Sequence, residues 1–197
     1  MPLYHLGGQL TSAWTNGLGT RELLARLPAE GPWSADEVEG DALEFKETPA
    51  TTRTPAHALK EASTRLRTDL VETAVSFANA RGGTVAIGVR DAPKAGERVV
   101  PGVDLDDWSP HDLRQLVHDR TSPHLLVEVE RVTIHERHVM LVHVSPGPDI
   151  YGTTQGVFKR RDGDKNRPLD EPTMRALRAA RGHYVKLDKL DEERPPG

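Results

Sequence analysis

The 197-residue sequence contains no cysteine and few aromatic residues, with three each of Trp, Tyr and Phe. The absence of cysteine excludes a disulfide framework, thiol catalysis and cysteine-ligated zinc. It is typical of proteins from reducing compartments, so we expect a cytoplasmic location. The low aromatic content argues against the extended base stacking that single-strand-binding proteins use.

Long hydrophobic runs and an excess of positive charge are also missing. No apolar stretch approaches the roughly 18 residues that a membrane span requires, and we expect no membrane association. The first residues have neither the basic nor the apolar region of a secretory signal. The formal net charge is −4, from 26 Lys and Arg against 30 Asp and Glu. Any contact with nucleic acid must therefore come from a local patch of positive charge.

The hydrophobic pattern predicts one compact domain over residues 36–185, preceded by an N-terminal extension over 1–35 and followed by a disordered tail over 186–197. Apolar residues at steps of three and four predict helices, and alternating or continuous apolar runs predict strands. The expected helices cover 57–80, 110–119 and 171–180, the last closed by Gly182, and the expected strands cover 42–46, 84–89, 125–132, 138–144 and 157–160. This order predicts an α+β fold with a mixed β-sheet packed against helices.

Two residue patterns mark the end of the long predicted helix over 57–80. Asn79 precedes a glycine pair, where its amide side chain suits a role in binding backbone groups at a turn. The pair Gly82-Gly83 allows the chain to reverse tightly into the next strand. These residues predict a close helix-to-strand corner.

The short strand over 42–46 separates apolar from charged side chains. Leu43 and Phe45 face the core, whereas Glu44 and Lys46 project to the other side. A solvated strand end, with Glu44 paired to a surface lysine, would explain this pattern without any further function.

Two more carboxylates are expected near Glu44. Glu39 would point to the opposite face of a straight strand, but a turn at Gly40-Asp41 can bring it back beside Glu44. Asp91 lies just past a buried strand. Three carboxylates together with Lys46 match what a Mg²⁺ or Mn²⁺ site for phosphodiester cleavage requires, because hard cations prefer oxygen ligands and a lysine steadies the phosphate charge.

Three segments in this order resemble the Schlafen AlbA-like domain family, in its bacterial single-lobe form. They are EGDALEFK at 39–46, VSFANARGGTVAIGVRD at 75–91 and VFKRR at 157–161. Pro101-Gly102-Val103 and Ser122-Pro123 match two further short elements of that family. The resemblance covers roughly residues 36–181 and implies the α+β fold of that domain.

The resemblance also implies a function. In Schlafen nucleases the matching positions form a metal-binding triad for RNA cleavage, notably of tRNA. Carried over, Glu39, Glu44 and Asp91 would hold Mg²⁺ or Mn²⁺ and act with Lys46 in an endoribonuclease for tRNA or other structured RNA. Two alternatives stay open, which are a noncatalytic DNA- or RNA-binding regulatory module and a protein-interaction or assembly domain of a larger regulator.

A basic cluster near the end of the chain is the best candidate for contacts with phosphate. Its cations are Lys159, Arg160, Arg161, Lys165 and Arg167. The alternative is a solvated hairpin in which Asp162 and Asp164 neutralise much of this charge.

The histidines and the glycine-containing segments do not indicate a metal or nucleotide site. The histidines around residues 135–143 are expected to lie on the surface. The sequence lacks both the P-loop and the G-x-G-x-x-G patterns, so it shows no place for a bound nucleotide. Eukaryotic Schlafen cores hold two related lobes, whereas this chain has one, and we therefore expect a symmetric homodimer that restores a two-lobed groove.

Overall fold

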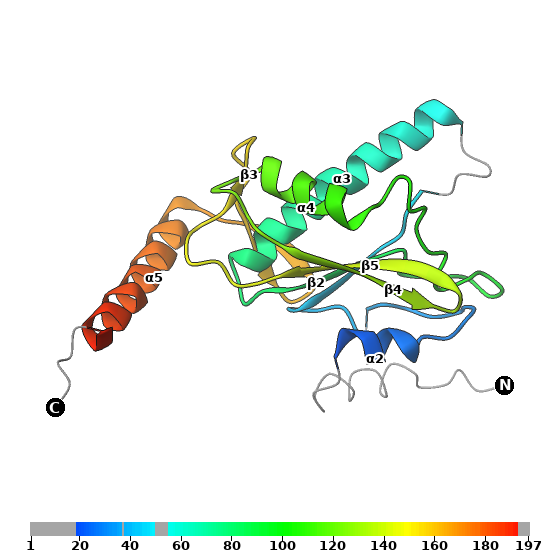
Figure 1. Cartoon of the computed structure of the whole chain (residues 1–197), viewed down its shortest axis with the longest axis horizontal. Coiled ribbons are helices and arrows are strands. Elements are labelled where there is room, and N and C mark those ends of the chain that lie inside the picture. Colours follow the sequence, from blue (N-terminus) through cyan, green and yellow to red (C-terminus); the bar gives the residue numbers. More distant parts are fainter. Residues whose placement is uncertain (1–18, 37, 50–54, 193–197) are drawn as a thin grey trace.

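The structure, a computed structural model, describes residues 19–36, 38–49 and 55–192. Helices and strands alternate from α2 to α4, and six strands then follow one another before the last helix (Figure 1). The helices are α2 (Thr20–Ala25), α3 (Ala56–Ala78), α4 (Pro110–Asp119) and α5 (Glu171–Glu192). The strands are β1 (Leu43–Lys46), β2 (Gly83–Ile87), β3 (Thr121–Ser122), β4 (Glu128–Ile134), β5 (Arg137–Val144), β6 (Gly152–Thr153), β7 (Lys159–Asp162) and β8 (Lys165–Pro168).

The central sheet has four strands in the order β1-β2-β5-β4. Strands β1 and β2 are parallel, with Phe45 opposite Ala86, and the other two pairs are antiparallel, with Ala86 opposite Leu141 in the next pair. Strands β3 and β6 form one small antiparallel pair, and β7 and β8 form another. The sheet is therefore mixed and the fold is α+β, which confirms the expectation from the sequence.

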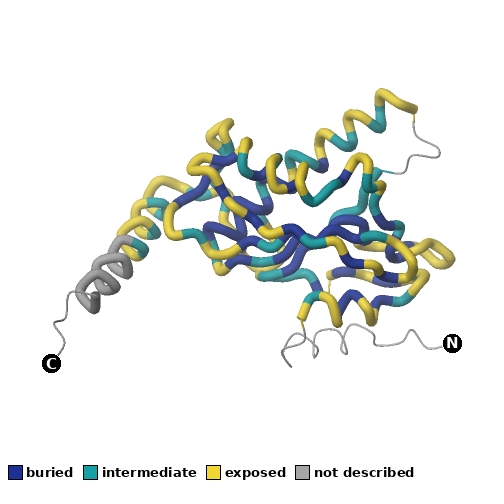
Figure 2. The backbone as a smooth tube through the Cα atoms, in the orientation of Figure 1, coloured by how far each residue is buried: buried dark blue, intermediate teal, exposed yellow. Residues whose placement is uncertain are grey.

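Both faces of the central sheet are covered. Helices α3 and α4 lie on one face, where Phe77 packs with Val85 and Val142. Helix α2 and the chain after it lie on the other face (Figure 1), where Leu23 packs with Phe45. The burial-coloured tube in Figure 2 shows the buried residues concentrated between these layers. The described part of the expected N-terminal extension therefore contributes to the core of the domain.

Helix α5 differs from its predicted end. It continues through Gly182 to Glu192 and projects from the body of the molecule (Figure 1). A single glycine costs a helix interior only about 1 kcal/mol relative to alanine, so the surrounding helix formers override it. Neither α5 nor any other helix of the described chain is both long and apolar enough to cross a bilayer.

Candidate functional site

Strand β1 forms one edge of the sheet, and two of its outward backbone groups are satisfied by side chains and a turn. The Phe45 N–H donates to Oε1 of Glu39 at 2.6 Å. The Leu43 carbonyl accepts from the Gly40 N–H at 3.2 Å and from the Arg161 guanidinium at 3.3 Å. The turn after Glu39 thus folds its carboxylate back onto β1, which otherwise would present unpaired groups to solvent.

Glu44 lies on the α3 side of β1 and is 8% exposed. Its Oε1 is 2.5 Å from Nζ of Lys46, and its Oε2 is 2.7 Å from Nη2 of Arg161. Each carboxylate oxygen therefore has a cationic partner. The contact with Lys46 is a charge-assisted hydrogen bond and that with Arg161 is an ion pair, and together they hold Glu44 in a defined orientation.

Arg161 is buried, with 4% of its surface exposed. Besides Glu44, it donates to the Gly40 carbonyl at 2.9 Å and to Oδ1 of Asn166 at 3.1 Å. Its guanidinium also lies 5.1 Å from the centre of the Phe77 ring, a cation–π distance. The expectation that Arg161 contacts nucleic acid does not fit this placement, because its donors already bind protein groups in the interior.

The other two candidate carboxylates lie within range of these charges. Burial raises the pKa of Glu39 to about 7, and the charges of Glu44 and Asp91 add to the rise. Burial also raises the pKa of Asp91 to about 6, opposed by the charge of Lys46 and reinforced by that of Glu44. Asp91 is exposed as a residue, so water screens its carboxylate more than that of the half-buried Glu39. The four groups thus form one electrostatically coupled cluster.

This arrangement does not fit a Mg²⁺ or Mn²⁺ site as it stands. Among the described residues, no three His, Cys, Asp or Glu side chains are placed to hold a metal ion. One oxygen of Glu44 already accepts from Lys46, and the other forms an ion pair with Arg161. A cation would have to compete with both of these partners.

The basic cluster folds into the hairpin of β7 and β8. Arg160 lies directly opposite Arg167, and Asp162 lies opposite Lys165. Because side chains alternate along a strand, these residues share the face opposite to that of the buried Arg161. All four are exposed, and Arg167 pairs with Asp162. We call Arg160, Lys165 and Arg167 the basic hairpin face.

The inward face of the same hairpin binds α3. Lys159 forms an ion pair with Glu72. Asn166 accepts from the Ser76 hydroxyl at 2.7 Å and donates to the Thr73 hydroxyl at 2.9 Å. Lys159 is therefore engaged in packing the hairpin, which leaves three of the five predicted cations on the solvent side.

Asn79 fixes the chain that leads into this hairpin. Its amide nitrogen donates to the carbonyls of Tyr151 at 2.7 Å and Lys159 at 2.8 Å. Its amide oxygen accepts from the Tyr151 N–H at 2.8 Å. The sequence predicts that this amide binds backbone groups, and it does so across two distant segments.

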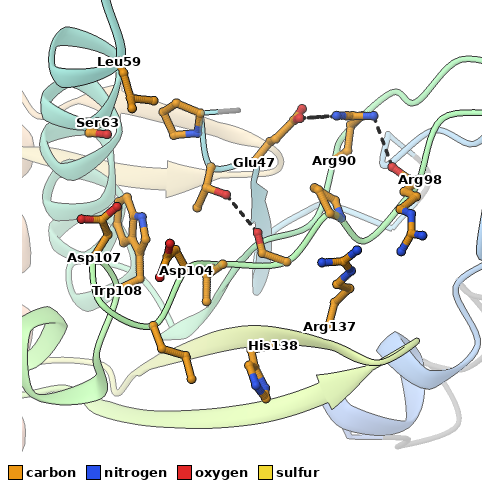
Figure 3. Close-up of a pocket in the computed structure, with 16 residues that line it drawn as sticks. Glu47, Leu59, Ser63, Arg90, Arg98, Asp104, Asp107, Trp108, Arg137 and His138 are labelled. Carbon is orange, nitrogen blue, oxygen red and sulfur yellow. Dashed lines mark hydrogen bonds and ion pairs between the residues drawn. The ribbon is translucent and has the colours of Figure 1, made fainter. Parts of the chain in front are cut away.

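A cleft of about 670 Å³ opens beyond the carboxyl ends of β1 and β2 (Figure 3). Arg90, Arg98 and Arg137 line one end of it, and Asp104 and Asp107 line the other. Sequence reasoning missed these arginines, because Arg90 and Arg98 lie in the connection between β2 and α4, Arg137 begins β5, and none belongs to a binding motif. The signal in the sequence that could have found this cleft is the pair Gly88 and Gly102, because glycine allows two backbone segments to approach closely.

The chain is similar in sequence to one protein family. Residues 39–170 match the family model described as Schlafen, AlbA_2. A search among curated proteins finds no significant match.

Of two solved structures that the comparison matches, one is similar in fold. The crystal structure of the DIP2311 protein from Corynebacterium diphtheriae superposes with a TM-score of 0.60 at 19% identity, over 86% of this chain and 29% of that chain. This chain thus spans less than a third of that protein. The N-terminal domain of a RecG-related protein from Nitrosomonas europaea gives a TM-score of 0.38 at 15% identity, over 85% of this chain and 96% of that domain. The second similarity is too low to support an argument.

Proposed function

The chain belongs to the Schlafen AlbA_2 family, and we propose that it binds nucleic acid through its basic hairpin face. The observation that carries this proposal is the pairing of Arg160 directly opposite Arg167 on the solvent side of the hairpin. Family membership supports a function related to nucleic acid. The net charge of the chain is negative, and the hairpin provides a local positive patch that could attract phosphate.

Like charges directly opposite each other destabilise a pair of strands. Asp162 offsets the charge of Arg167, but no described residue forms an ion pair with Arg160 or Lys165. Arg181 lies near enough to Arg160 that the two repel, although burial is the larger cause of the lowered pKa of Arg181. A phosphate placed over Arg160 would relieve this repulsion, and guanidinium groups match phosphate geometry well.

The test is a binding titration of the full chain with fluorescently labelled single-stranded RNA and duplex DNA at several salt concentrations. The triple variant Arg160→Gln/Lys165→Gln/Arg167→Gln should bind more weakly to every sequence. On duplex DNA, the slope of log K against log salt should fall by up to about 0.9 for each phosphate that the variant no longer binds.

A matched control removes the same number of positive charges elsewhere. Arg26, Arg65 and Arg131 are exposed and lie outside the hairpin. Their replacement by glutamine should leave the salt slope unchanged, because bulk charge is not what positions the phosphates. If both triple variants lose affinity equally, the hairpin is an ordinary solvated surface and the proposal fails.

A second candidate function is RNA cleavage dependent on Mg²⁺ or Mn²⁺, with tRNA as the first substrate to test. The observation that favours it is the clustering of Glu39, Glu44, Asp91 and Lys46 close enough for each to feel the charge of others. The ion pairs of Glu44 stand against a preformed metal site. Cleavage would therefore require Glu44 to exchange at least one of these partners when metal and RNA bind.

The test for cleavage uses tRNA, single-stranded RNA and DNA with Mn²⁺, Mg²⁺ or a chelator. Cleavage that stops with chelator and in Glu44→Gln would support this second function. A pure preparation that binds RNA but cleaves none of the three substrates in Mn²⁺ would leave the noncatalytic function alone. Cleavage that persists in Glu44→Gln would point to a different site or to contamination.

A further inference from the structure

The cleft beyond β1 and β2 is built by a close approach of three chain segments. The Gly102 N–H donates to the Gly88 carbonyl at 3.0 Å, and the Val103 N–H donates to the His138 carbonyl at 2.9 Å. Gly88 and Gly102 have φ of +105° and +82°. A Cβ at Gly102 would lie 2.9 Å from Cβ of Arg137. Glycine at this position therefore lets β5 approach the floor of the cleft.

The arginine end of the cleft is partly preorganised. Nε and Nη2 of Arg90 both donate to Oε1 of Glu47, at 2.9 and 2.6 Å. Arg98 and Arg137 are exposed and form no ion pair within the described part of the chain. Figure 3 shows the three arginines gathered on the right of the cleft. Two uncommitted guanidinium groups beside a fixed third one match the multiple oxygens of a phosphate.

The opposite end of the cleft has a different character. Asp104, Asp107 and Ser63 line it together with the apolar Leu59 (Figure 3). Trp108 is 3% exposed and has the Arg67 guanidinium 4.8 Å from its ring centre, so it serves as wall rather than as a stacking platform. Carboxylates repel phosphate but accept hydrogen bonds from hydroxyl groups.

We propose that this cleft binds a ribose phosphate, as part of a nucleotide or at the end of an RNA strand, with the phosphate at the Arg98 and Arg137 end and the sugar hydroxyls at the Asp104 and Asp107 end. The volume of about 670 Å³ lies within the usual range for small-molecule sites. The two ends are charged oppositely, so they favour a ligand that is anionic at one end and rich in hydroxyl donors at the other. A polyanion such as pyrophosphate matches only one end.

This binding site is separate from the basic hairpin face and does not depend on its function. The cleft lies at the N-terminal part of α3, where Leu59 and Ser63 line it. The hairpin packs against the C-terminal part of α3, where Asn166 binds Ser76. The two proposals can therefore fail independently.

The experiment is isothermal titration of the full chain with AMP, pyrophosphate and 2′,3′-dideoxy-AMP. We expect AMP to bind more tightly than either of the others. Arg98→Gln/Arg137→Gln should weaken AMP binding at least about tenfold, because it removes two charge-assisted contacts. Arg26→Gln/Arg131→Gln removes two exposed arginines outside the cleft and should leave AMP binding unchanged.

A second variant tests the opposite end. Asp104→Asn/Asp107→Asn should reduce the preference for AMP over its dideoxy analogue. The same variant should bind pyrophosphate as well as or better than the wild-type chain, since it removes repulsion. A variant that misfolds would lose binding of both AMP and pyrophosphate. Its unfolding curve would distinguish misfolding from a specific loss of contacts with the sugar hydroxyls.

Two sources of the ligand are distinguished by a trinucleotide RNA carrying a 5′-phosphate. Tighter binding of this RNA than of AMP identifies the end of a strand as the natural ligand, and the reverse order identifies a free nucleotide. In both cases binding must be sensitive to Arg98→Gln/Arg137→Gln. The proposal is overturned if AMP gives no binding up to about 5 mM, or if only the hairpin variant weakens it.

Discussion

The guanidinium of Arg161 lies 2.7 Å from the carboxylate of Glu44, and both side chains are almost fully removed from water. This ion pair joins β7 to β1, segments far apart in the sequence. A buried ion pair contributes little net stability relative to a well-packed apolar pair. Removing one partner, however, leaves the other charge buried without a partner, which is destabilising. Glu44 and Arg161 should therefore be interdependent in folding as well as in orientation.

We predict that Arg161→Met lowers the free energy of unfolding by about 3–5 kcal/mol, because Glu44 is left with Lys46 alone. Urea unfolding measures this. Arg160→Met, at the exposed neighbouring position, should change stability by less than about 0.5 kcal/mol. Adding Glu44→Gln to Arg161→Met should recover part of the loss, and a double variant that is strictly additive would contradict the coupling.

The hydrogen bonds of the Asn79 side chain should stabilise the fold. Replacement by alanine removes three hydrogen bonds and leaves the buried Tyr151 N–H without its acceptor. We expect a loss of about 2–4 kcal/mol in urea unfolding. Asn79→Asp keeps one acceptor oxygen but faces the Tyr151 and Lys159 carbonyls with a carboxylate, so it should be no better tolerated. An alanine variant with the unfolding midpoint of the wild-type chain would show that these contacts are dispensable.

Gly102 and Gly96 form a matched pair for testing the floor of the cleft. Their φ values are +82° and +78°, but a Cβ at Gly96 would meet nothing within 4 Å, whereas one at Gly102 would crowd Arg137. Gly96→Ala should cost about 1–2 kcal/mol from backbone strain alone. Gly102→Ala should cost about 1–3 kcal/mol more from overpacking. Equal losses in the two variants would mean that the approach of β5 to Gly102 is not tight.

The raised pKa of Glu39 predicts a dependence of stability on pH. Its pKa is 4.5 in the reference state and about 7 in the folded chain, so the folded chain holds more protons between these values. The favourable contribution of the protonated group is therefore complete below pH 4.5 and is lost as the pH rises through 7.

Glu39→Gln keeps an acceptor for the Phe45 N–H but removes the charge. Relative to the wild-type chain, the variant should gain stability as the pH rises, by on the order of 2 kcal/mol at about pH 8. At about pH 4 the two chains should differ little. Denaturation curves at both pH values measure the difference. If the stabilities of the two chains differed by the same amount at every pH, ionisation of Glu39 would not destabilise the folded chain.

The symmetric homodimer expected from the single lobe stays a prediction. Closed twofold pairing is the commonest route by which one lobe can form a groove with its copy. Light scattering at micromolar concentrations, with and without RNA, measures the molecular mass directly. A monomer under both conditions would contradict the expectation.

Local periodicity explains why most elements could be predicted. The helix expected over 57–80 corresponds to α3, and the strands expected over 84–89 and 138–144 correspond to β2 and β5. These segments bury one stripe or run of apolar residues, which short-range patterns report. The partners of strands far apart in the sequence are a long-range property, so the order of the central sheet was not accessible from the pattern, whereas the local hairpin of β7 and β8 was one of the alternatives.

The burial of Arg161 could not be predicted from the sequence pattern. Alternation in a strand indicates that Arg160 and Arg161 face opposite sides. It does not indicate which side α3 covers, and that packing decides which arginine is buried. The cleft was missed for a related reason, because Arg90 and Arg98 come together with Arg137 only where the connection between β2 and α4 meets β5.

The hydrogen bond from the Phe45 N–H to Glu39 also limits how copies of this chain can associate. An edge strand with free donors is a template for addition of a strand from another molecule. At β1, Glu39 accepts from the outward N–H of Phe45, and Gly40 and Arg161 donate to the outward carbonyl of Leu43. A dimer of this chain should therefore not extend its sheet across β1, and concentrated protein is protected against edge-to-edge aggregation at that strand.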